Sequence, residues 1–571
     1  MSHLDWIVLV CTLACIVVYG LYKSRTSKNL EGYFLSNRSL PWYLVLLSIM
    51  GTQASAITFL SAPGQAFTDG MRFVQYYFGL PLAMIVLCIT FVPLFSKLKV
   101  FTAYEYLEKR FDSKTRTFTS LLFLVSRGLS TGVSIYAPSI ILSSLLGWDI
   151  FWTNIVMGGF LIIYTVSGGA KAVAYTQKIQ MVIIFFGMFA AGYCMIHYLP
   201  KGEGFKQALQ LSGVGGKMNV ITTGFTAKGF DWKDKYNIIS GIIGGFFLAL
   251  SYFGTDQSQV GRYLTAKTVT QSRIGLLING LVKVPMQFFI LLLGAMLFAF
   301  YQFNAAPVFF NKALADKGKQ TAYAPQLSSL ENAYYNQQLQ QQANSKQYLQ
   351  HTTDTSFRNN IKQGATKLAT IQQQYKTTLK QAFPDADTND TNYIFLRFVI
   401  DFLPKGLVGL LIAIIFMSAW GSIAAALNAL ASSTMIDFHR TIKKDYSRFE
   451  SDTHIAQYEY KTAKYYTLAW GIFSIITAEF STGIGSLIEV VNILGSLFYG
   501  VILGIFLVGF YLKSIKGNAV FYAAIISELF VITLFTLDKY NIIGLGFLWL
   551  NVFGALSVVV VSSIIAVINK Q

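Results

Sequence analysis

Long apolar runs follow one another along most of the chain and are separated by short polar connections. A run of about 20 apolar residues crosses a hydrocarbon core of roughly 30 Å as a helix. The pattern therefore predicts an all-α polytopic membrane protein with about 13 transmembrane helices, at residues 6–22, 41–67, 74–95, 117–146, 150–167, 173–197, 237–253, 274–302, 404–436, 463–480, 483–511, 517–536 and 545–568.

Basic residues cluster in short connections at 23–38, 97–116 and 440–448. If the N-terminus lies outside, all three connections are cytoplasmic, as the positive-inside rule requires. An odd number of spans then places the C-terminus in the cytoplasm. We therefore expect a multi-pass protein of the cell (inner) membrane. The formal net charge of +18 indicates orientation rather than a nucleic-acid partner.

Two spans contain interruptions, although every backbone group in hydrocarbon needs a hydrogen-bond partner. The second span is interrupted at Gly51, Ala54–Ala56, Pro63 and Gly64, and the seventh at Gly244, Gly245, Ser251 and Gly254. Interrupted spans five positions apart are typical of transporters built from inverted repeats, which bind solute and ion near the midplane. The alternative is that the glycines only allow close packing of helices.

Two cations lie deep inside apolar spans, where ionisable groups are rare and usually functional. Arg127 and Lys283 are each roughly ten residues, or ~15 Å, from the cytoplasmic end of their span. Snorkelling does not easily rescue a cation at that depth, so we expect one of the two to meet an anionic substrate. The alternative is an ion pair with Asp256, Asp401 or Glu489.

The connection at roughly 304–391 is long and rich in Gln and Asn, as in YYNQQLQQQANSKQYLQ. Its few apolar residues have helix-compatible spacing, so we expect a solvated helical hairpin or a partly disordered cap without a catalytic role. The five His are scattered, and the four Cys lie in apolar segments without metal-ligand spacing. We therefore expect no enzyme, no metal centre of such ligands and no disulfide framework.

Five segments carry a family resemblance: SAITFLSAPGQAF, VSIYAPSIIL, YTVSGGAKAVAYTQKIQ, YFGTDQSQVGRYLTAK and LPKGLVGLLIAIIFMSAWGSIAAALNALASSTMID. In this order they resemble the sodium/solute symporter family, which includes the sodium-coupled glucose, iodide, monocarboxylate, proline and sialic acid transporters. The third and fourth segments are closest to the iodide/monocarboxylate branch.

The resemblance implies a leucine-transporter-type core of two inverted five-helix repeats, with alternating access around a central substrate. It divides the chain into an N-terminal extra helix and cytoplasmic loop (1–40), a first repeat (41–197), an outer loop (198–236), a second repeat (237–511) interrupted by the 304–391 outer insertion, and two C-terminal extra helices (512–571).

The family's shared sodium site uses carbonyls of the first broken helix, with a carbonyl and two hydroxyls of the ninth span. The resemblance assigns these roles to Gly51, Ala54, Ser418, Gly421 and Ser422. Gly421 stands where the family has a hydroxyl, so one oxygen ligand is lost. That loss weakens the site unless water or another group replaces the ligand. Sodium is nevertheless the expected coupling ion.

The sixth span departs from the family pattern TDxxQ, because this chain has Thr176-Gln177-Lys178-Ile179-Gln180. An acidic group near the sodium exit path is missing, and a cation stands beside its place. The ammonium of Lys178 could replace the ion or shuttle a proton. The alternative is that Lys178, which is shallow in its span, snorkels to the surface.

The substrate site departs from the sugar-binding members of the family. Thr58 and Ala249 replace a Gln and another amide, so a pyranose site of that type is not expected. Lys283 matches a lysine of some sugar-binding members, Tyr252 matches an aromatic gate, and carboxylate-binding relatives have an Arg in the fourth span. We expect an organic anion or acidic sugar to be bound by Thr58, Tyr77, Arg127, Tyr252 and Lys283.

The favoured function is therefore sodium-coupled symport of a small organic solute, with the solute and the lipid bilayer as partners and no obligate protein partner. One alternative is a proton-coupled or uncoupled transporter of the same fold, with Lys178 in place of sodium. A channel or membrane sensor is a more distant alternative, since no charged pore rings and no signalling domain are visible.

Overall fold

The computed structural model of the chain describes residues 1–24, 29–443, 451–481 and 485–568. Within these residues the chain is helical almost throughout. Its one sheet pairs two short antiparallel strands, β1 (Phe225–Thr226) and β2 (Gly229–Phe230). The expected all-α fold class is confirmed. Parts of the basic connections at 23–38 and 440–448, residues 483–484 of the eleventh span, and residues 569–571 of the C-terminal unit lie outside the described residues.

The first half of the chain forms the helices α1 (His3–Ser24), α2 (Leu30–Leu35), η1 (Ser36–Arg38), α3 (Trp42–Gln53), α4 (Ala56–Asp69), η2 (Met71–Tyr77), α5 (Leu80–Val86), η3 (Leu87–Phe91), α6 (Val92–Leu98), α7 (Glu105–Arg110), α8 (Ser113–Leu146), α9 (Ile150–His197), α10 (Phe205–Val214), η4 (Ser240–Gly244), α11 (Gly245–Thr255) and α12 (Gln257–Tyr263).

The second half forms α13 (Val269–Phe300), α14 (Lys312–Gly318), α15 (Ala324–Gln350), α16 (Thr355–Ala382), η5 (Thr391–Tyr393), α17 (Ile394–Phe402), α18 (Leu407–Ser433), η6 (Thr434–His439), α19 (Arg440–Ile442), α20 (Asp452–Glu479), α21 (Leu487–Tyr511), α22 (Gly517–Lys539) and α23 (Leu548–Ile568).

By length and composition, nine helices of the described residues can cross a membrane, or ten if the bent pair of α3 and α4 is one span. Two shorter apolar helical segments, Ile150–Val166 and Ser240–Thr255, coincide with the fifth and seventh expected spans. The tenth expected span lies in the second half of α20, whose first half is polar. Every expected span therefore has a helical counterpart, and the polytopic membrane fold is confirmed.

The second expected span is broken at Ala54 and Ser55, where α3 and α4 meet at an angle of 58°. Pro63 and Gly64, which the sequence also marked as an interruption, lie inside helical α4, so that part of the expectation is wrong. Gly64 serves close packing instead, because a Cβ there would lie 2.0 Å from the carbonyl oxygen of Thr391 in η5.

The interruption expected in the seventh span lies instead just beyond its expected end, at Asp256, which separates α11 from α12 with an extended backbone (φ −75°, ψ 117°). The glycines that suggested an earlier break, including Gly244 and Gly245, lie in continuous helix. A Cβ on Gly245 would lie 2.4 Å from the carbonyl oxygen of Tyr76. For these glycines the alternative reading, close helix packing, is the correct one.

The fifth and sixth expected spans form one long element, α9, which turns sharply at Gly169 (φ 59°, ψ −169°). A side chain is strained at such a positive φ. There is also no space for one, because a Cβ would lie 2.8 Å from Cδ2 of Tyr33. The turn directs the second half of α9 back through the bundle, where it packs against α3 and α18.

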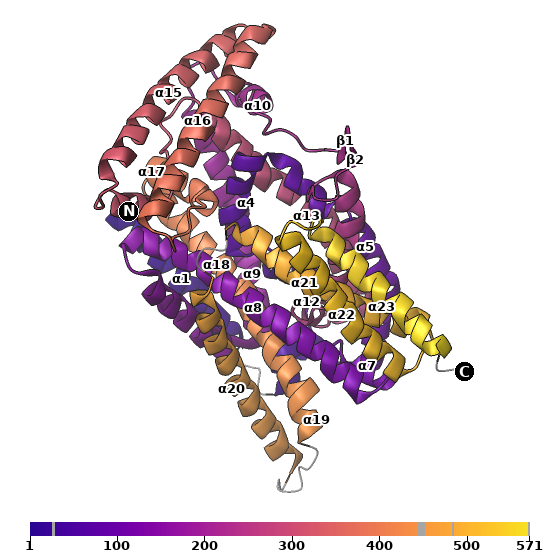
Figure 1. Ribbon diagram of the computed structural model, residues 1–571. Coiled ribbons are helices and arrows are strands. Elements are labelled where there is room, and N and C mark those ends of the chain that lie inside the picture. The colour runs from indigo at the N-terminus through magenta and orange to yellow at the C-terminus, as the bar shows by residue number, and fades with distance from the viewer. Residues whose placement is uncertain (25–28, 444–450, 482–484, 569–571) are drawn as a thin grey trace.

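Helix α18 lies at the centre of the bundle and packs against α9, α1, α8, α20, α12 and α3 (Figure 1). In its most apolar 18-residue stretch, 89% of the residues are buried, more than in any other candidate span of the described residues. Small and hydroxyl side chains on a helix so enclosed contact other helices rather than lipid. Its polar residues are therefore placed to bind ions or solutes, or to join helices.

The segment between α13 and α18 projects from one end of the bundle as a helical hairpin of α15 and α16 (Figure 1). An apolar cluster that includes Leu327, Tyr334, Tyr375 and Leu379 joins the two helices. The hairpin agrees with one of the two expected forms, the solvated helical hairpin.

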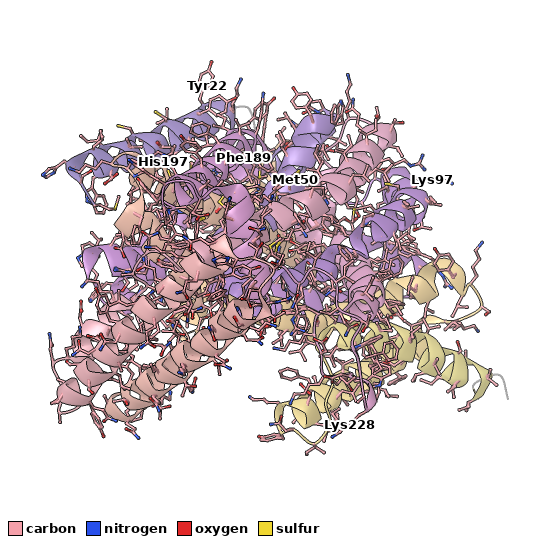
Figure 2. All side chains as sticks on the ribbon, turned by 90° about the horizontal axis from the view of Figure 1, so that it is seen from above. Tyr22, Met50, Lys97, Phe189, His197 and Lys228 are labelled. Carbon is pink, nitrogen blue, oxygen red and sulfur yellow. The ribbon has the colours of Figure 1, made fainter. Side chains whose placement is uncertain are left out.

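Side chains fill the space between the helices when the bundle is seen from above (Figure 2). Met50, near the break in α3, is 2% exposed, whereas Phe189 on the second half of α9 is 66% exposed. Exposed aromatic side chains on a spanning helix face lipid. Polar side chains buried inside the bundle therefore contact other helices or a cavity rather than lipid.

Candidate functional site

A cavity of about 90 Å³ lies beside the break between α3 and α4. Its walls come from α3 and α4, η2, α8, α11 and α21, and are formed by Gln53, Ser55, Ile57, Thr58, Tyr76, Tyr77, Arg127, Leu248, Tyr252, Ile488, Val491, Asn492, Gly495 and Tyr499. Four of the five expected substrate residues, all except Lys283, thus line one cavity. The space is small enough to hold a few water molecules.

Arg127 enters the cavity wall from α8 and is 8% exposed. Its Nη2 donates to Oγ of Ser258 at 2.5 Å and to the hydroxyl of Tyr252 at 3.5 Å. Its Nε lies 3.7 Å from Oδ2 of Asp256 and makes no hydrogen bond within the described residues. The ion pair that the sequence analysis treated as the alternative is present, and the guanidinium still has a free donor.

Asp256 is held in place from both sides. Its Oδ1 accepts from the backbone N–H of Ser258 at 2.7 Å, which caps the first turn of α12. Its Oδ2 accepts from the hydroxyl of Tyr499 on α21 at 2.7 Å. Arg127 and Asp256 therefore tie α8, α21 and the break between α11 and α12 together beside the cavity.

Lys283 of α13 is fully buried, and its Nζ has no hydrogen-bond partner within the described residues. The Nζ lies 5.7 Å from the centre of the Tyr77 ring, so the lysine stands behind the cavity wall. Asn279 and Gln287, one helical turn to either side, are also fully buried, and the side-chain N and O atoms of both lack partners there. Such groups are costly to bury unless they meet water or a ligand.

Asp401 and Glu489, the other carboxylates considered as partners, are engaged elsewhere. Asp401 pairs with Arg397 at 2.6 Å, and Glu489 pairs with Lys235 at 2.9 Å. Neither of these ion pairs involves Lys283.

The expected sodium ligands lie on α3 and α18, which pack against each other. The hydroxyls of Ser418 and Ser422 are turned to their own helix and donate to the carbonyl oxygens of Ile415 at 2.8 Å and Ala419 at 3.0 Å. The carbonyl oxygen of Gly421 accepts a hydrogen bond from Nε2 of Gln177 at 3.2 Å. A glutamine from α9 thus lies between the two helices.

Comparison with known proteins agrees with this architecture. The model of the sodium:solute symporter family matches residues 33–330 and 364–527. The chain belongs to the sodium:solute symporter family. The gap in the match, 331–363, falls within the α15–α16 hairpin. Members of this family are transporters, so the expectation that the chain is not an enzyme is confirmed.

Relatives within the family carry different solutes. The chain is 24% identical to a sodium/sialic acid symporter of Proteus mirabilis over 99% of this chain and 95% of that protein. It is 32% identical to the human sodium/iodide cotransporter over 44% of this chain and 38% of that protein. A solved structure of a Na⁺-coupled sialic acid symporter in a substrate-bound, outward-open state is 23% identical, with a TM-score of 0.72 over 99% of this chain and 98% of that one. The latter similarity supports the symporter fold.

The structure does not bring Lys178 to the expected ion ligands. Successive helix residues point about 100° apart, so Lys178 and its neighbour Gln177 face different sides of α9. Lys178 is exposed, with its Nζ 5.7 Å from the centre of the Tyr43 ring. The snorkelling alternative describes this position better than an ammonium in the ion site.

Gln177 is the residue that the sequence analysis missed. The available signal was a polar amide inside an apolar run, at the position where the family pattern TDxxQ has its acidic residue. The analysis gave weight to charge and therefore followed Lys178 instead. Tyr76, Asn492 and Tyr499 of the cavity wall were also missed, because polar and aromatic residues are common in spans and give no distinct pattern.

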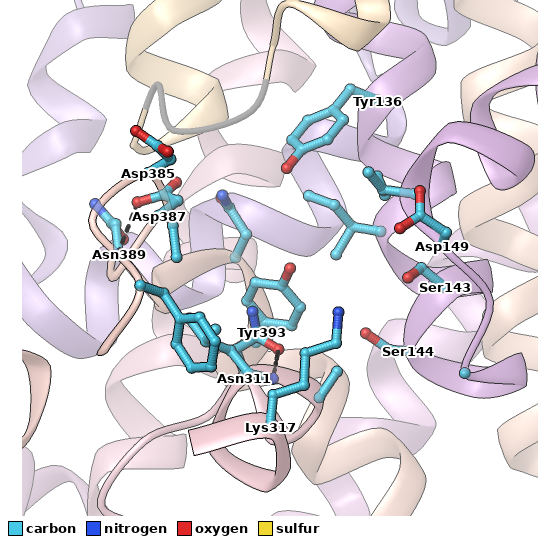
Figure 3. A pocket seen from close by; sticks show the side chains of 18 of the residues that line it. Tyr136, Ser143, Ser144, Asp149, Asn311, Lys317, Asp385, Asp387, Asn389 and Tyr393 are labelled. Carbon is cyan, nitrogen blue, oxygen red and sulfur yellow. Dashed lines mark hydrogen bonds between the residues drawn. The ribbon is translucent and has the colours of Figure 1, made fainter. Parts of the chain in front are cut away.

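A second, larger cavity of about 900 Å³ lies near the base of the hairpin (Figure 3). Lys317, Asp385 and Asp387 line it from the insertion, and Tyr136 and Asp149 line it from α8 and the start of α9. It does not include Arg127 or Lys283, so its size does not make it the solute site.

Proposed function

We propose that this symporter carries a small organic anion, such as a carboxylate or an acidic sugar, by alternating access. The observation that carries the proposal is the guanidinium of Arg127, which lies in the wall of the 90 Å³ cavity beside its ion pair with Asp256. A guanidinium binds carboxylates through paired N–H donors.

The charges around the cavity favour an anion. Arg127 is balanced by Asp256, whereas no described carboxylate pairs with Lys283. When Lys283 is protonated, this group of three carries a net positive charge. An anionic substrate would neutralise it and would supply acceptors for the unused donors. Two relatives are named for sialic acid, which is an acidic sugar and fits this class.

The size and position of the cavity support alternating access. A space of about 90 Å³ is too small for most organic acids, so the helices around it have to separate for loading. The break between α3 and α4 lies beside it, and the ends of a broken helix absorb changes in direction more readily than a continuous helix does. Thr58, Tyr77 and Tyr252 would then contact the substrate directly.

Sodium is the coupling ion that family membership favours, with Gly51, Ala54, Ser418 and Ser422 as its ligands and no hydroxyl from Gly421. A second candidate is a carrier of the same fold that moves its solute without sodium at this place. The hydrogen bond from Gln177 to the carbonyl of Gly421 favours it. We place the protein in the inner membrane, with the N-terminus outside and the C-terminus in the cytoplasm.

Counterflow in proteoliposomes tests the proposed solute class. Vesicles loaded with an unlabelled organic acid should accumulate the labelled acid transiently, whereas its uncharged methyl ester should neither be accumulated nor compete. A panel of monocarboxylates and acidic sugars would identify the preferred substrate. A flux that does not saturate and shows no counterflow would instead indicate a channel.

A further inference from the structure

Gln177 joins three helices through its side-chain amide and is fully buried. Its Nε2 donates to Oγ1 of Thr52 on α3 at 3.3 Å and to the carbonyl oxygen of Gly421 on α18 at 3.2 Å. Its Oε1 accepts from Oγ of Ser48 on α3 at 2.8 Å. Both donors of the amide are therefore used, and both point at oxygen atoms on the two helices that carry the expected ion ligands.

Two glycines make room for this amide. A Cβ on Gly51 would lie 2.9 Å from Cγ of Gln177, and one on Gly421 would lie 3.2 Å from the same atom. The Cβ on Gly421 would also lie 2.7 Å from Oε1 of Gln180. The glycines on α3 and α18 and the glutamine on α9 thus fit one another. The amide of Gln177 occupies the space that a side chain at residue 421 would need, so the glycine and the glutamine depend on each other.

The same place offers little to a sodium ion. Sodium is a hard cation and takes several oxygen ligands, as other such cations do. Here Gly421 has no hydroxyl, and the amide of Gln177 occupies the space beside it and donates to its carbonyl oxygen at 3.2 Å. Of the two hydroxyls in the expected ligand set, only that of Ser422 is present; it donates to Ala419 and keeps its oxygen lone pairs.

We propose that the amide of Gln177 takes the place of the sodium ion between α3 and α18. Its two N–H groups present positive charge to Thr52 and Gly421, as a cation would, and hold the helices together without one. Of the two coupling candidates, this favours the carrier that moves its solute without sodium at this place. It rests on the proposed transport function only for the flux measurement described below. It replaces the role suggested for Lys178.

Sodium binding to the purified full-length protein tests the proposal without a substrate. A bound ion raises the free energy of unfolding by RT ln(1 + [Na⁺]/Kd), so a thermal midpoint measured in NaCl and in choline chloride of equal concentration reports it. The wild type should unfold at the same temperature in both salts. Gln177→Asp, which supplies a carboxylate, should unfold at a higher temperature in NaCl, and Gln177→Asp combined with Gly421→Ser should respond more strongly.

Lys178→Gln is the matched control, because it changes the adjacent but exposed residue and should leave the sodium response at zero. A saturable sodium response of the wild type that disappears in Ser422→Ala would overturn the proposal. So would the absence of any sodium response in both Gln177 variants, because something other than Gln177 would then exclude the ion. If Gln177→Asp folds poorly, Gln177→Glu, which keeps the length of the side chain and also supplies a carboxylate, gives the same reading.

Counterflow separates failure of this inference from failure of the proposed function. Anion exchange by the wild type should proceed at the same rate with choline in place of sodium on both sides. Exchange that requires sodium would overturn the role of Gln177 and leave the solute class intact. If no organic anion exchanges, the proposed function fails, while the thermal measurement still decides whether Gln177 replaces the ion.

Discussion

Replacing Arg127 by Gln would leave the carboxylate of Asp256 buried without its cation. Asp256 is 1% exposed and would keep only the hydrogen bonds from Tyr499 and the backbone of Ser258. At the 3.7 Å between Arg127 Nε and Asp256 Oδ2, two unit charges attract by about 4 kcal/mol at an effective dielectric constant of about 20. Breaking a buried pair from one side costs about 3–5 kcal/mol, which agrees.

A double-mutant cycle isolates this term. Asp256→Asn removes the charge with little change of shape, so Arg127→Gln combined with Asp256→Asn should recover about 3 kcal/mol of the stability lost in Arg127→Gln. Thermal or denaturant unfolding of the purified protein in one detergent measures all members of the cycle. If Arg127→Gln unfolds at the same midpoint as the wild type, the ion pair does not form and the electrostatic account of the site is wrong.

Substrate binding should not recover with stability. A hydrogen bond to a charged group contributes about 1.5–3 kcal/mol, so the double variant should bind the transported anion about 10- to 150-fold more weakly. Arg127→Lys keeps the charge but loses the paired N–H donors of the guanidinium. Its affinity for the anion should therefore lie between those of the wild type and the double variant. Counterflow titrated with substrate gives the affinity. A stable double variant with wild-type affinity would show that Arg127 is a structural cation and would remove the main support for an anionic substrate.

Three further substitutions test the neighbouring structure. Lys283→Met should bind the anion about tenfold more weakly without lowering the thermal midpoint, since it removes a buried cation that has no described hydrogen-bond partner; a large loss of stability would contradict this. Asp437 of η6 is fully buried and pairs with Arg116 of α8 at 2.8 Å, so Asp437→Asn should cost about 3 kcal/mol at unchanged substrate affinity. The control Asp401→Asn, at the more exposed pair with Arg397, should cost under about 1 kcal/mol. Gly294→Val places a Cβ 2.1 Å from the carbonyl oxygen of Pro63 and should reduce folded yield in fluorescence-detected size-exclusion chromatography; a normal yield would show that α13 and α4 can separate at no cost.

The number and type of the spans could be predicted because hydrocarbon imposes a minimum length on an apolar helix. Thr58, Tyr77, Arg127 and Tyr252 could be selected because depth in the membrane and family resemblance both restrict polar groups to the interior. The structure brings these four residues to one cavity although they belong to four different helices. Their convergence depends on helix packing, which no single span records.

The position of the helix breaks could not be read from glycine and proline alone. Pro63 lies in continuous helix, and Gly245 supports a close approach to η2. The interruption expected in the seventh span lies just beyond its expected end, at Asp256, whose side chain caps the next helix and receives Tyr499 from α21. A backbone interruption persists in a membrane where its freed groups find partners, and those partners come from distant parts of the chain.

The packing of Gln177 at the expected ion site also could not be read from the sequence. It changes what is expected of sodium coupling. Gly51, Gln177 and Gly421 are far apart in the sequence, and only the assembled helices show that the two glycines accommodate the one amide. A cation held by oxygen ligands makes closure depend on ion concentration, whereas hydrogen bonds from an amide are present at any concentration. If Gln177 holds α3 and α18 together, the closed bundle has the same stability with and without sodium. Net transport would then follow the gradient of the anion itself or of a proton, and the charge that responds to the substrate would be on Arg127 and Lys283.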